Sequence, residues 1–492
     1  MLNCFIYWLR AVYYCQMESL NKEIAPAVVY PEKVLQFGTG VLLRGLPDFF
    51  IEKANRKGVF GGSILVVKST ANGGTDHFLA QDNRYTIHIK GLEKGQEVSE
   101  TLVVSAINRV VSAQHDWSEI LEAASDPALQ IVISNTTEVG IVLDEHDRLS
   151  AAPPQTFPGK LTAFLYRRYE AFEGDEAKGL VILPTELIDK NGQQLKDIVL
   201  QLARISNLPP AFVEWLATAN TFCNTLVDRI VPGKLPQADQ LRAEAESGYR
   251  DSLAIMAEPF RLWAIETADE RVKNILSFAE ADPGVVLTPD ITKFKELKLR
   301  LLNGTHTFSC ALAMLGGWPT VKEAMQDDVF ARFVKNLMTL EIIPSLSAVA
   351  IGEAEARVFA DSVIDRFGNP FLNHQWKSIS LNYTAKMEMR NVATIQRYTQ
   401  VKLETPAYMA LGFAAYLLLM RDAQLDDPNA GEIKQAWKHA DINSVVDAAL
   451  GQSAVWKTDL RTHEAFAQSV KQQLACLLEN GVPDTIKSIV EA

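Results

Sequence analysis

The first half of the chain alternates short apolar runs with amphipathic stretches. The runs predict strands at residues 34–37, 63–67, 101–104, 131–133 and 180–183, and a Gly-rich turn with a helix-like stretch follows the first of them. Apolar runs that are bounded by turns and separated by helices indicate a largely parallel sheet with both faces covered. The first half is therefore predicted to be an α/β, Rossmann-type doubly wound domain.

The second half has helical periodicity and few strand signals. Four stretches, residues 292–315, 330–349, 406–422 and 464–481, repeat their apolar positions every three to four residues. The segment ADPGVVLTPD at residues 281–290 contains three chain-breaking residues and is predicted to be a boundary. We expect a Rossmann-type domain over residues 17–285 and a mostly α-helical C-terminal domain over residues 286–492.

Composition fits two domains and excludes several classes of protein. A length of 492 residues exceeds one ordinary core, and the net charge of −12 argues against a basic surface that binds nucleic acid. A few local cations can still hold one anionic substrate inside such a protein. The odd number of scattered cysteines, without a CxxC pair, favours a reducing cytoplasm over a disulfide framework or a zinc site: Cys4, Cys15, Cys223, Cys310 and Cys476.

The first sixteen residues, MLNCFIYWLRAVYYCQ, form an apolar segment that Arg10 interrupts. The run is shorter than the roughly 20 residues that span a bilayer, and it lacks a basic start and a cleavage site. We interpret residues 1–16 as an appended segment, with a membrane-surface anchor as the alternative. The sequence leaves a monomer and a homo-oligomer equally open.

The turn after the first predicted strand reads Gly38-Thr39-Gly40-Val41-Leu42-Leu43. Its first two glycines fit the dinucleotide fingerprint, in which one makes the tight turn and the next lets the backbone approach a pyrophosphate. Leu43 stands where the third glycine would be, so an ordinary strand-to-helix turn is the alternative. The second strand ends at Lys68 without the acidic residue that usually holds the ribose of NAD, which leaves NADP open.

The segment Lys298-Leu-Arg-Leu-Leu-Asn303-Gly304-Thr305-His306 carries the candidate chemistry. On an α-helix, Lys298, His306 and Asn303 fall at roughly 0°, 80° and 140°, on one side of it. A desolvated lysine with a lowered pKa can take a hydroxyl proton as hydride leaves, while an amide stabilises the oxyanion and an imidazole orients the hydroxyl. Gly304 costs a helix on the order of 1 kcal/mol, which a close neighbour such as a substrate or cofactor ring would explain.

These residues resemble those of the polyol-specific long-chain dehydrogenases, the mannitol dehydrogenase family. The resemblance covers nearly the whole chain: KLRLLNGTHTF is similar to the catalytic helix, QFGTGVLLRG to the cofactor turn, SNTTEVG to the strand end near the nicotinamide, and FCNTLVDRIVP and EPFRLWAIE to two later signatures. It implies that Lys298 is the general acid/base, Asn303 the oxyanion-stabilising amide and His306 the substrate-orienting histidine. It also implies no catalytic metal. The implied cofactor contacts are Phe37, Gly38, Gly40, Val41, Leu42, Lys68, Asn135 and Thr136.

The same resemblance implies substrate contacts at Asp228 and, by a looser match, Lys386. Leu187 replaces an asparagine of the polyol members, and the pattern P-x-E-L-I with NTTE and LNGTHT resembles the tagaturonate reductase branch. That branch implies reversible reduction of D-tagaturonate to D-altronate with NADH. A sugar-acid carboxylate needs a cation, for which Lys386, Arg366 and Arg390 are candidates.

Three alternatives stay open at this stage. Two of them lie within the enzyme class, a fructuronate reductase and a mannitol-type polyol dehydrogenase. Outside it, the fold could serve a nucleotide-binding sensor, although an intact Lys298, Asn303 and His306 argues against a protein without the chemistry.

Overall fold

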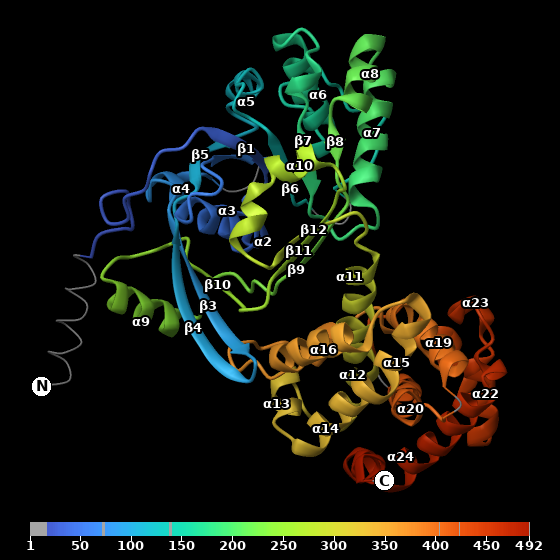
Figure 1. Cartoon of the computed structure of the whole chain (residues 1–492). Coiled ribbons are helices and arrows are strands. Elements are labelled where there is room, and N and C mark those ends of the chain that lie inside the picture. Colours follow the sequence, from blue (N-terminus) through green and yellow to red (C-terminus); the bar gives the residue numbers. More distant parts are fainter. Residues whose placement is uncertain (1–16, 71–73, 137–139, 403, 423, 492) are drawn as a thin grey trace, which may run out of the picture. The chain divides into compact units, whose positions relative to one another are not determined.

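The computed structural model of the chain describes residues 17–70, 74–136, 140–402, 404–422 and 424–491. The segment interpreted as appended, residues 1–16, and residues 137–139 of the SNTTEVG motif lie outside this part. The chain divides into two compact units (Figure 1). The first holds residues up to Lys90 together with Val98–Ile291, and the second holds Gly91–Glu97 together with residues from Thr292 onward.

A six-stranded parallel sheet forms the centre of the first unit (Figure 1). Its order is β5-β2-β1-β6-β7-β8, so the direction of winding reverses between β1 and β6, as in a doubly wound Rossmann sheet. This confirms the predicted fold class. The strands are β1 (Glu32–Phe37), β2 (Ser63–Lys68), β5 (Ile107–Ser112), β6 (Ile131–Ser134), β7 (Val181–Pro184) and β8 (Thr221–Phe222).

Both faces of this sheet are buried, which explains why its strands read as continuous apolar runs. On one face Leu35 and Leu65 pack against the helices α5 to α8. On the other face Val34 and Ile64 pack with Phe50 of α3. The helices of the unit are α2 (Val41–Gly45), α3 (Pro47–Arg56), α4 (Asp76–Leu79), α5 (Trp117–Ala123), α6 (Phe157–Ala171), α7 (Asn191–Ile205), α8 (Pro210–Thr218), α9 (Gln237–Ser247) and α10 (Glu270–Ile275), with short 3-10 turns η1 (Glu176–Lys178) and η2 (Ser277–Ala281).

The remaining strands form two three-stranded sheets. The sequence pattern did not show that these strands lie outside the main sheet. The predicted strand at residues 101–104 is part of β4, which lies in a sheet of order β10-β3-β4. In the main sheet it is β5 that pairs with β2. The other order is β12-β11-β9. Because β12 pairs with β11 inside the expected boundary segment, the first unit continues through this segment as far as Ile291. These strands are β3 (Tyr85–Glu93), β4 (Gln96–Val104), β9 (Thr225–Asp228), β10 (Ile255–Ala257), β11 (Leu262–Glu266) and β12 (Val285–Thr288).

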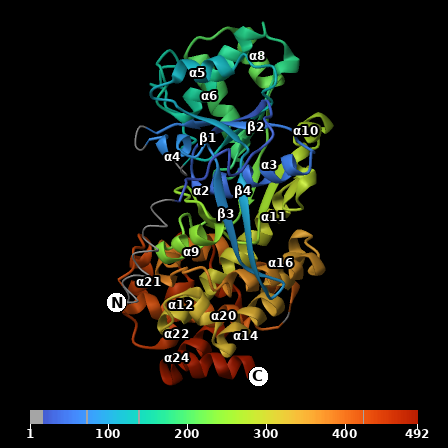
Figure 2. The same ribbon diagram turned by 90° about the vertical axis from the view of Figure 1, so that its left-hand side faces the viewer.

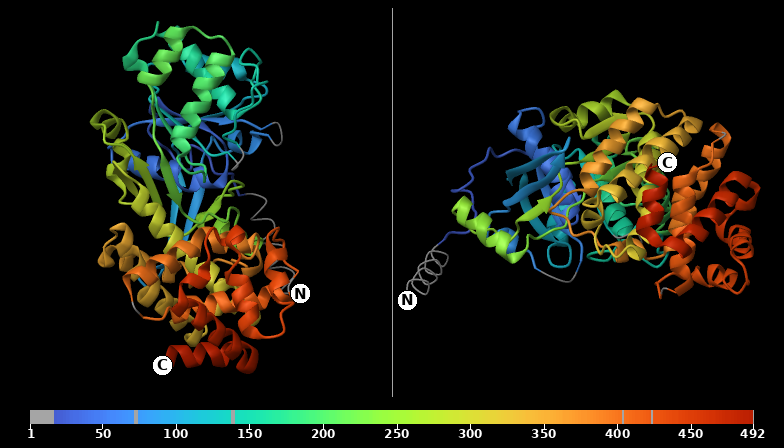
Figure 3. Two further views of the ribbon diagram at one scale, coloured as in Figure 1. Left: turned by 90° about the vertical axis from the view of Figure 1, so that its right-hand side faces the viewer. Right: turned by 90° about the horizontal axis from the view of Figure 1, so that it is seen from below.

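The second unit is helical, and the described residues after Ile291 form no strand, which confirms the prediction. Helix α20 (Ala407–Asp422) is buried along almost its whole length and packs against α12 and α24 (Figure 2). Figure 3 shows the same bundle, yellow to red, from two further sides. None of the helices in the described part is long and apolar enough to cross a membrane.

The remaining helices of this unit are mostly short, and three of them are π-helices. They are α11 (Thr292–Leu297), η3 (Lys298–Gly304, π), α12 (Thr305–Leu315), α13 (Val321–Met325), α14 (Asp328–Asn336), η4 (Leu337–Ile342, π), α15 (Ile343–Leu346), η5 (Ser347–Val349, 3-10), α16 (Glu353–Phe367), α17 (Trp376–Ile379), α18 (Tyr383–Met387), η6 (Glu388–Val392, π), α19 (Ala393–Val401), α21 (Ala430–Ala436), α22 (Ile442–Leu450), α23 (Ser453–Trp456), η7 (Leu460–Thr462, 3-10) and α24 (Glu464–Glu491).

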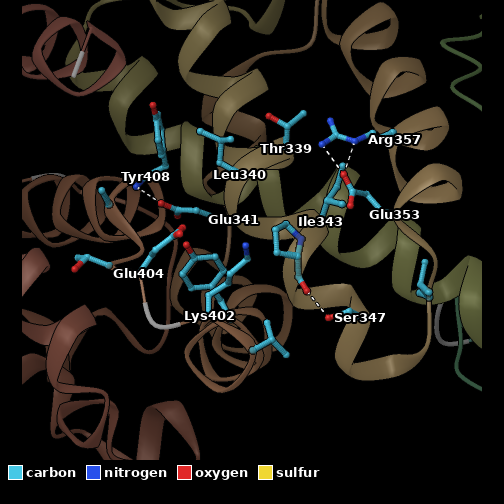
Figure 4. A pocket seen from close by; sticks show the side chains of 16 residues that line it. Thr339, Leu340, Glu341, Ile343, Ser347, Glu353, Arg357, Lys402, Glu404 and Tyr408 are labelled. Carbon is cyan, nitrogen blue, oxygen red and sulfur yellow. Dashed lines mark hydrogen bonds and ion pairs between the residues drawn. The ribbon is translucent and has the colours of Figure 1, made fainter.

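The start of α20 is held by a buried carboxyl group (Figure 4). Glu341 accepts hydrogen bonds from the backbone N–H groups of Tyr408 (2.8 Å) and Met409 (2.7 Å). Burial nevertheless raises the pKa of Glu341 to about 8, more than these backbone donors lower it. The folded protein therefore keeps a proton there that the unfolded chain releases near the ordinary glutamate pKa.

This difference predicts a pH-dependent stability. Because the folded pKa is raised, the contribution of Glu341 is present at acid pH and is lost as pH rises from the unfolded pKa towards about 8. Thermal unfolding across this interval should show a midpoint that falls with pH more steeply in the wild type than in Glu341→Gln, whose neutral amide cannot titrate. Glu404→Gln, which removes an exposed carboxylate of the same cavity, is the control. Parallel profiles for wild type and Glu341→Gln would contradict the assignment.

Candidate functional site

In the glycine turn after β1, neighbouring atoms lie close to the backbone of Gly38. Gly38 has φ +129°, and a Cβ on it would lie 2.8 Å from Leu43 Cδ1 and 3.2 Å from the Asn135 carbonyl oxygen. Leu43, at the place of a third glycine, thus packs directly over the first one. A Cβ on Gly40 would meet nothing within 4 Å, and Gly40 is exposed. The turn leaves an accessible strip of backbone, as a bound pyrophosphate requires.

The other predicted cofactor residues of the turn differ in exposure. Phe37 is fully buried, and its ring packs 5.2 Å from that of Phe157, so only its backbone is available to a ligand. Val41 and Leu42, at the start of α2, are half-buried. Asn135 follows β6 beside this turn, and its backbone N–H donates to the Phe37 carbonyl over 3.3 Å.

A buried carboxyl group that the sequence had not singled out joins the ends of β6 and β7. Glu186 Oε1 accepts from the backbone N–H (2.8 Å) and the hydroxyl (3.0 Å) of Thr136, and Oε2 accepts from the Ser134 hydroxyl (3.2 Å). Burial raises the pKa of Glu186. The next residue, Leu187, is 62% exposed in this structure. Glu186 therefore fixes the backbone of Thr136, one of the predicted cofactor contacts.

Lys68 and Asp228 also lie in the first unit. Lys68 is buried at the end of β2, and its Nζ donates to the Thr70 carbonyl. Asp228 is buried at the end of β9, where it is paired with Leu262 of β11.

The segment with Lys298, Asn303 and His306 is helical, but it is not a continuous α-helix. Lys298 and Asn303 lie on the π-helix η3 and His306 on α12, so the spacing calculated for an α-helix does not hold here. Lys298 and Asn303 are half-buried, and His306 is buried. π-Helical insertions of this kind are frequent at functional sites.

A second π-helix, η6, packs against η3. The buried Arg300 donates from Nη1 to the carbonyl oxygens of Met389 (2.9 Å) and Arg390 (2.7 Å), and its Nε donates to Glu296 (3.1 Å). A Cβ on Gly304 would lie 2.9 Å from Asn391 Oδ1. The neighbour that requires Gly304 is therefore the side chain of Asn391, and the expected substrate or cofactor ring is not needed to explain it.

His306 lies in an aromatic and cationic environment. Its ring stacks on Phe367, with centroids 4.0 Å apart and planes 16° apart, and meets His374 and Trp376 edge to face. Burial, followed by the charges of His374, Arg390, Arg366 and Lys386, holds the pKa of His306 well below its ordinary value. Its Nε2 atom is buried without a hydrogen-bond partner among the described residues. A neutral imidazole with an unpaired nitrogen can donate to or accept from a hydroxyl.

The second unit thus holds Lys298, Asn303, His306, Arg366 and Lys386, with Arg390 beside them, while the predicted cofactor residues and Asp228 belong to the first unit. A cavity of about 540 Å³ in the second unit lies elsewhere. Its lining includes Glu341, Arg357 and Tyr408 but none of the predicted site residues (Figure 4). Among the described residues, no three His, Cys, Asp or Glu side chains gather as a metal site.

Comparison with known families agrees with this architecture. A model of the mannitol dehydrogenase Rossmann domain matches residues 32–276, and a model of the mannitol dehydrogenase C-terminal domain matches residues 290–478. The chain belongs to the mannitol dehydrogenase family. The resemblance found in the motifs is confirmed at this level.

Relatives of this chain match over nearly its full length. A protein of Bacillus subtilis (strain 168) named altronate oxidoreductase is 39% identical, covering 95% of this chain and 97% of its own. A protein of the same name from Bacteroides thetaiotaomicron is 35% identical, covering 96% and 100%.

Solved structures of two dehydrogenases share the fold. Mannitol 2-dehydrogenase of Pseudomonas fluorescens, solved as a ternary complex with NAD and D-mannitol, has a TM-score of 0.67 at 23% identity, covering 96% of this chain and 99% of its own. A D-sorbitol dehydrogenase in substrate-free form has a TM-score of 0.76 at 24% identity, covering 96% and 100%.

Proposed function

We propose that the protein is an altronate oxidoreductase, which reversibly reduces D-tagaturonate to D-altronate with NADH. We choose this substrate because relatives that are 35–39% identical over nearly the whole chain are named altronate oxidoreductase. The chemistry rests on Lys298, Asn303 and His306, which the fold keeps on one helical segment of the second unit.

The first unit fits a nicotinamide dinucleotide. The left-handed Gly38, the open backbone at Gly40 and the half-buried Val41 and Leu42 provide a turn that a pyrophosphate can approach. Asn135 and Thr136, the latter held by Glu186, lie at the end of β6, next to β1. When bound, NADH supplies the hydride that reduces the substrate ketone. We assign NAD over NADP because the motifs resemble the tagaturonate reductase branch, which implies NAD.

The second unit supplies the proton and the hydrogen bonds to the reacting oxygen. Lys298 Nζ gives a proton to the alkoxide oxygen as the ketone is reduced, and takes it back in the oxidation direction. The Asn303 amide donates a hydrogen bond to the same oxygen as its charge develops. His306, neutral because burial and neighbouring cations lower its pKa, uses Nε2 to orient a substrate hydroxyl.

Steady-state assays with three carbonyl substrates and both cofactors test this proposal. We expect kcat/KM to be highest for D-tagaturonate with NADH, lower for D-fructuronate and lowest for D-fructose, and lower for NADPH than for NADH. Faster turnover of fructose would replace the sugar-acid assignment with a polyol dehydrogenase, and a preference for fructuronate would replace it with the other ketouronate. Absence of turnover with all three, despite NADH binding, would favour a nucleotide sensor.

A further inference from the structure

Lys386 and Arg390, two of the cations near His306, differ in their partners from the other arginines of this region. Arg300 and Arg397 both pair with Glu296, at 3.1 Å and 2.5 Å. Among the described residues, no carboxylate favours the charged form of Lys386 or Arg390, and burial lowers the pKa of both. In a chain of net charge −12, a local excess of positive charge favours the binding of an anion at that place.

Arg390 is the cation whose donors are best arranged for this. It lies on η6, where its backbone carbonyl accepts from Arg300, so the residue is held against the helix that carries Lys298. Its Nη1 donates to the Thr307 hydroxyl over 3.2 Å, and that hydroxyl donates to the Asn303 carbonyl over 2.9 Å. The guanidinium group is thereby anchored to the turn between Asn303 and Thr307.

The opposite edge of the same guanidinium group is left to bind a ligand. Arg390 Nε is buried and has no hydrogen-bond partner among the described residues. A buried donor without a partner is costly, and a guanidinium edge formed by Nε and Nη2 presents two parallel N–H groups that match a carboxylate. Lys386 is less suited, because its Nζ already donates to the Ile379 carbonyl over 3.0 Å and offers no fork.

We infer that Arg390 binds the carboxylate of the sugar acid through a forked hydrogen bond and so determines the preference for a uronate over a neutral ketose. The inference rests on the proposed function for the identity of the acid. Arg300, Glu296 and Gly304 act through Arg390 as positioning residues, because they fix η6 against η3.

Equilibrium binding in the presence of NADH tests the inference without turnover, since altronate cannot be oxidised while the reduced cofactor is bound. Isothermal titration compares D-altronate with D-altritol, which has a hydroxymethyl group in place of the carboxylate. Arg390→Gln should raise the Kd of altronate about tenfold to a hundredfold, as loss of charged hydrogen bonds does, and leave that of altritol unchanged. Arg390→Lys, which keeps the charge but not the fork, should give a smaller loss.

Two further variants separate the possible outcomes. Arg357→Gln removes an exposed arginine that pairs with Glu353 and should bind both ligands as the wild type does. Equal weakening of altronate and altritol in Arg390→Gln would make Arg390 a structural residue and overturn the inference. The inference would also be overturned if Lys386→Gln lost the preference for altronate over altritol while Arg390→Gln kept it. If the steady-state assays reject tagaturonate while altronate binding still depends on Arg390, the proposed function fails and the anion site stands.

Discussion

Replacing Lys298 with alanine should lower kcat for ketone reduction by about 10²–10⁴-fold and leave NADH affinity almost unchanged. The range is the usual contribution of a positioned acid/base group to proton transfer. NADH affinity should survive because the predicted cofactor turn belongs to the first unit and Lys298 to the second. Stopped-flow measurement of NADH oxidation gives the rate, and fluorescence titration of NADH gives the affinity.

Matched variants show whether the loss comes from proton transfer. Lys298→Arg keeps the positive charge but cannot release a proton near neutral pH, so we expect it to be as slow as the alanine variant. Lys293→Ala removes an exposed lysine of the preceding helix that pairs with Glu355 over 2.9 Å, and it should behave as the wild type. Near-normal turnover in Lys298→Ala would show that another group handles the proton.

Four strands of the central sheet, β1, β2, β6 and β7, could be predicted because they are largely buried and read as unbroken apolar runs. Strands β5 and β8, which contain polar or partly exposed residues, were not predicted. Strand β4 was found but could not be placed, since a local pattern at residues 101–104 does not reveal which strand it pairs with. The strand β12 was hidden in a segment whose Pro and Gly residues indicate a boundary. Which strands pair in a sheet depends on tertiary contacts, and a local sequence pattern does not show these.

The candidate site was predictable in its residue types and not in its geometry. Lys298, Asn303 and His306 stand out because polar groups are rare in an apolar helix. The π-helix that carries Lys298 and Asn303 packs against a second one ninety residues later in the chain, through the hydrogen bonds of Arg300. Nothing local to either segment encodes that contact. For the same reason the motif P-x-E-L-I, which contains Glu186, did not show that this carboxyl group is buried against Ser134 and Thr136, about fifty residues earlier.

The Asn191-Gly192 pair has a structural explanation in this fold. Asn191 is buried, and its Nδ2 lies within hydrogen-bond distance of three carbonyl oxygens, those of Pro184 (3.0 Å), Glu186 (3.0 Å) and Thr225 (3.2 Å). Its Oδ1 accepts from the backbone N–H groups of Gly192 and Thr225, each at 2.9 Å. One side chain therefore joins the end of β7, the start of β9 and the start of α7.

Asn191→Ala should lower the free energy of unfolding by roughly 3–5 kcal/mol, because it leaves several buried backbone groups without a partner at once. Asn191→Asp has the same shape, but an ionised carboxylate cannot donate to the three carbonyl oxygens, and it should be at least as unstable. Gln193→Ala, an exposed change two residues along α7, should cost less than about 0.5 kcal/mol. Chemical denaturation followed by circular dichroism measures all three, and hydrogen exchange should show faster opening of residues 184–192 in the alanine variant. A wild-type unfolding curve for Asn191→Ala would mean that the carbonyl groups find water in its place, and that the segment carrying Glu186 and Leu187 is held by other contacts.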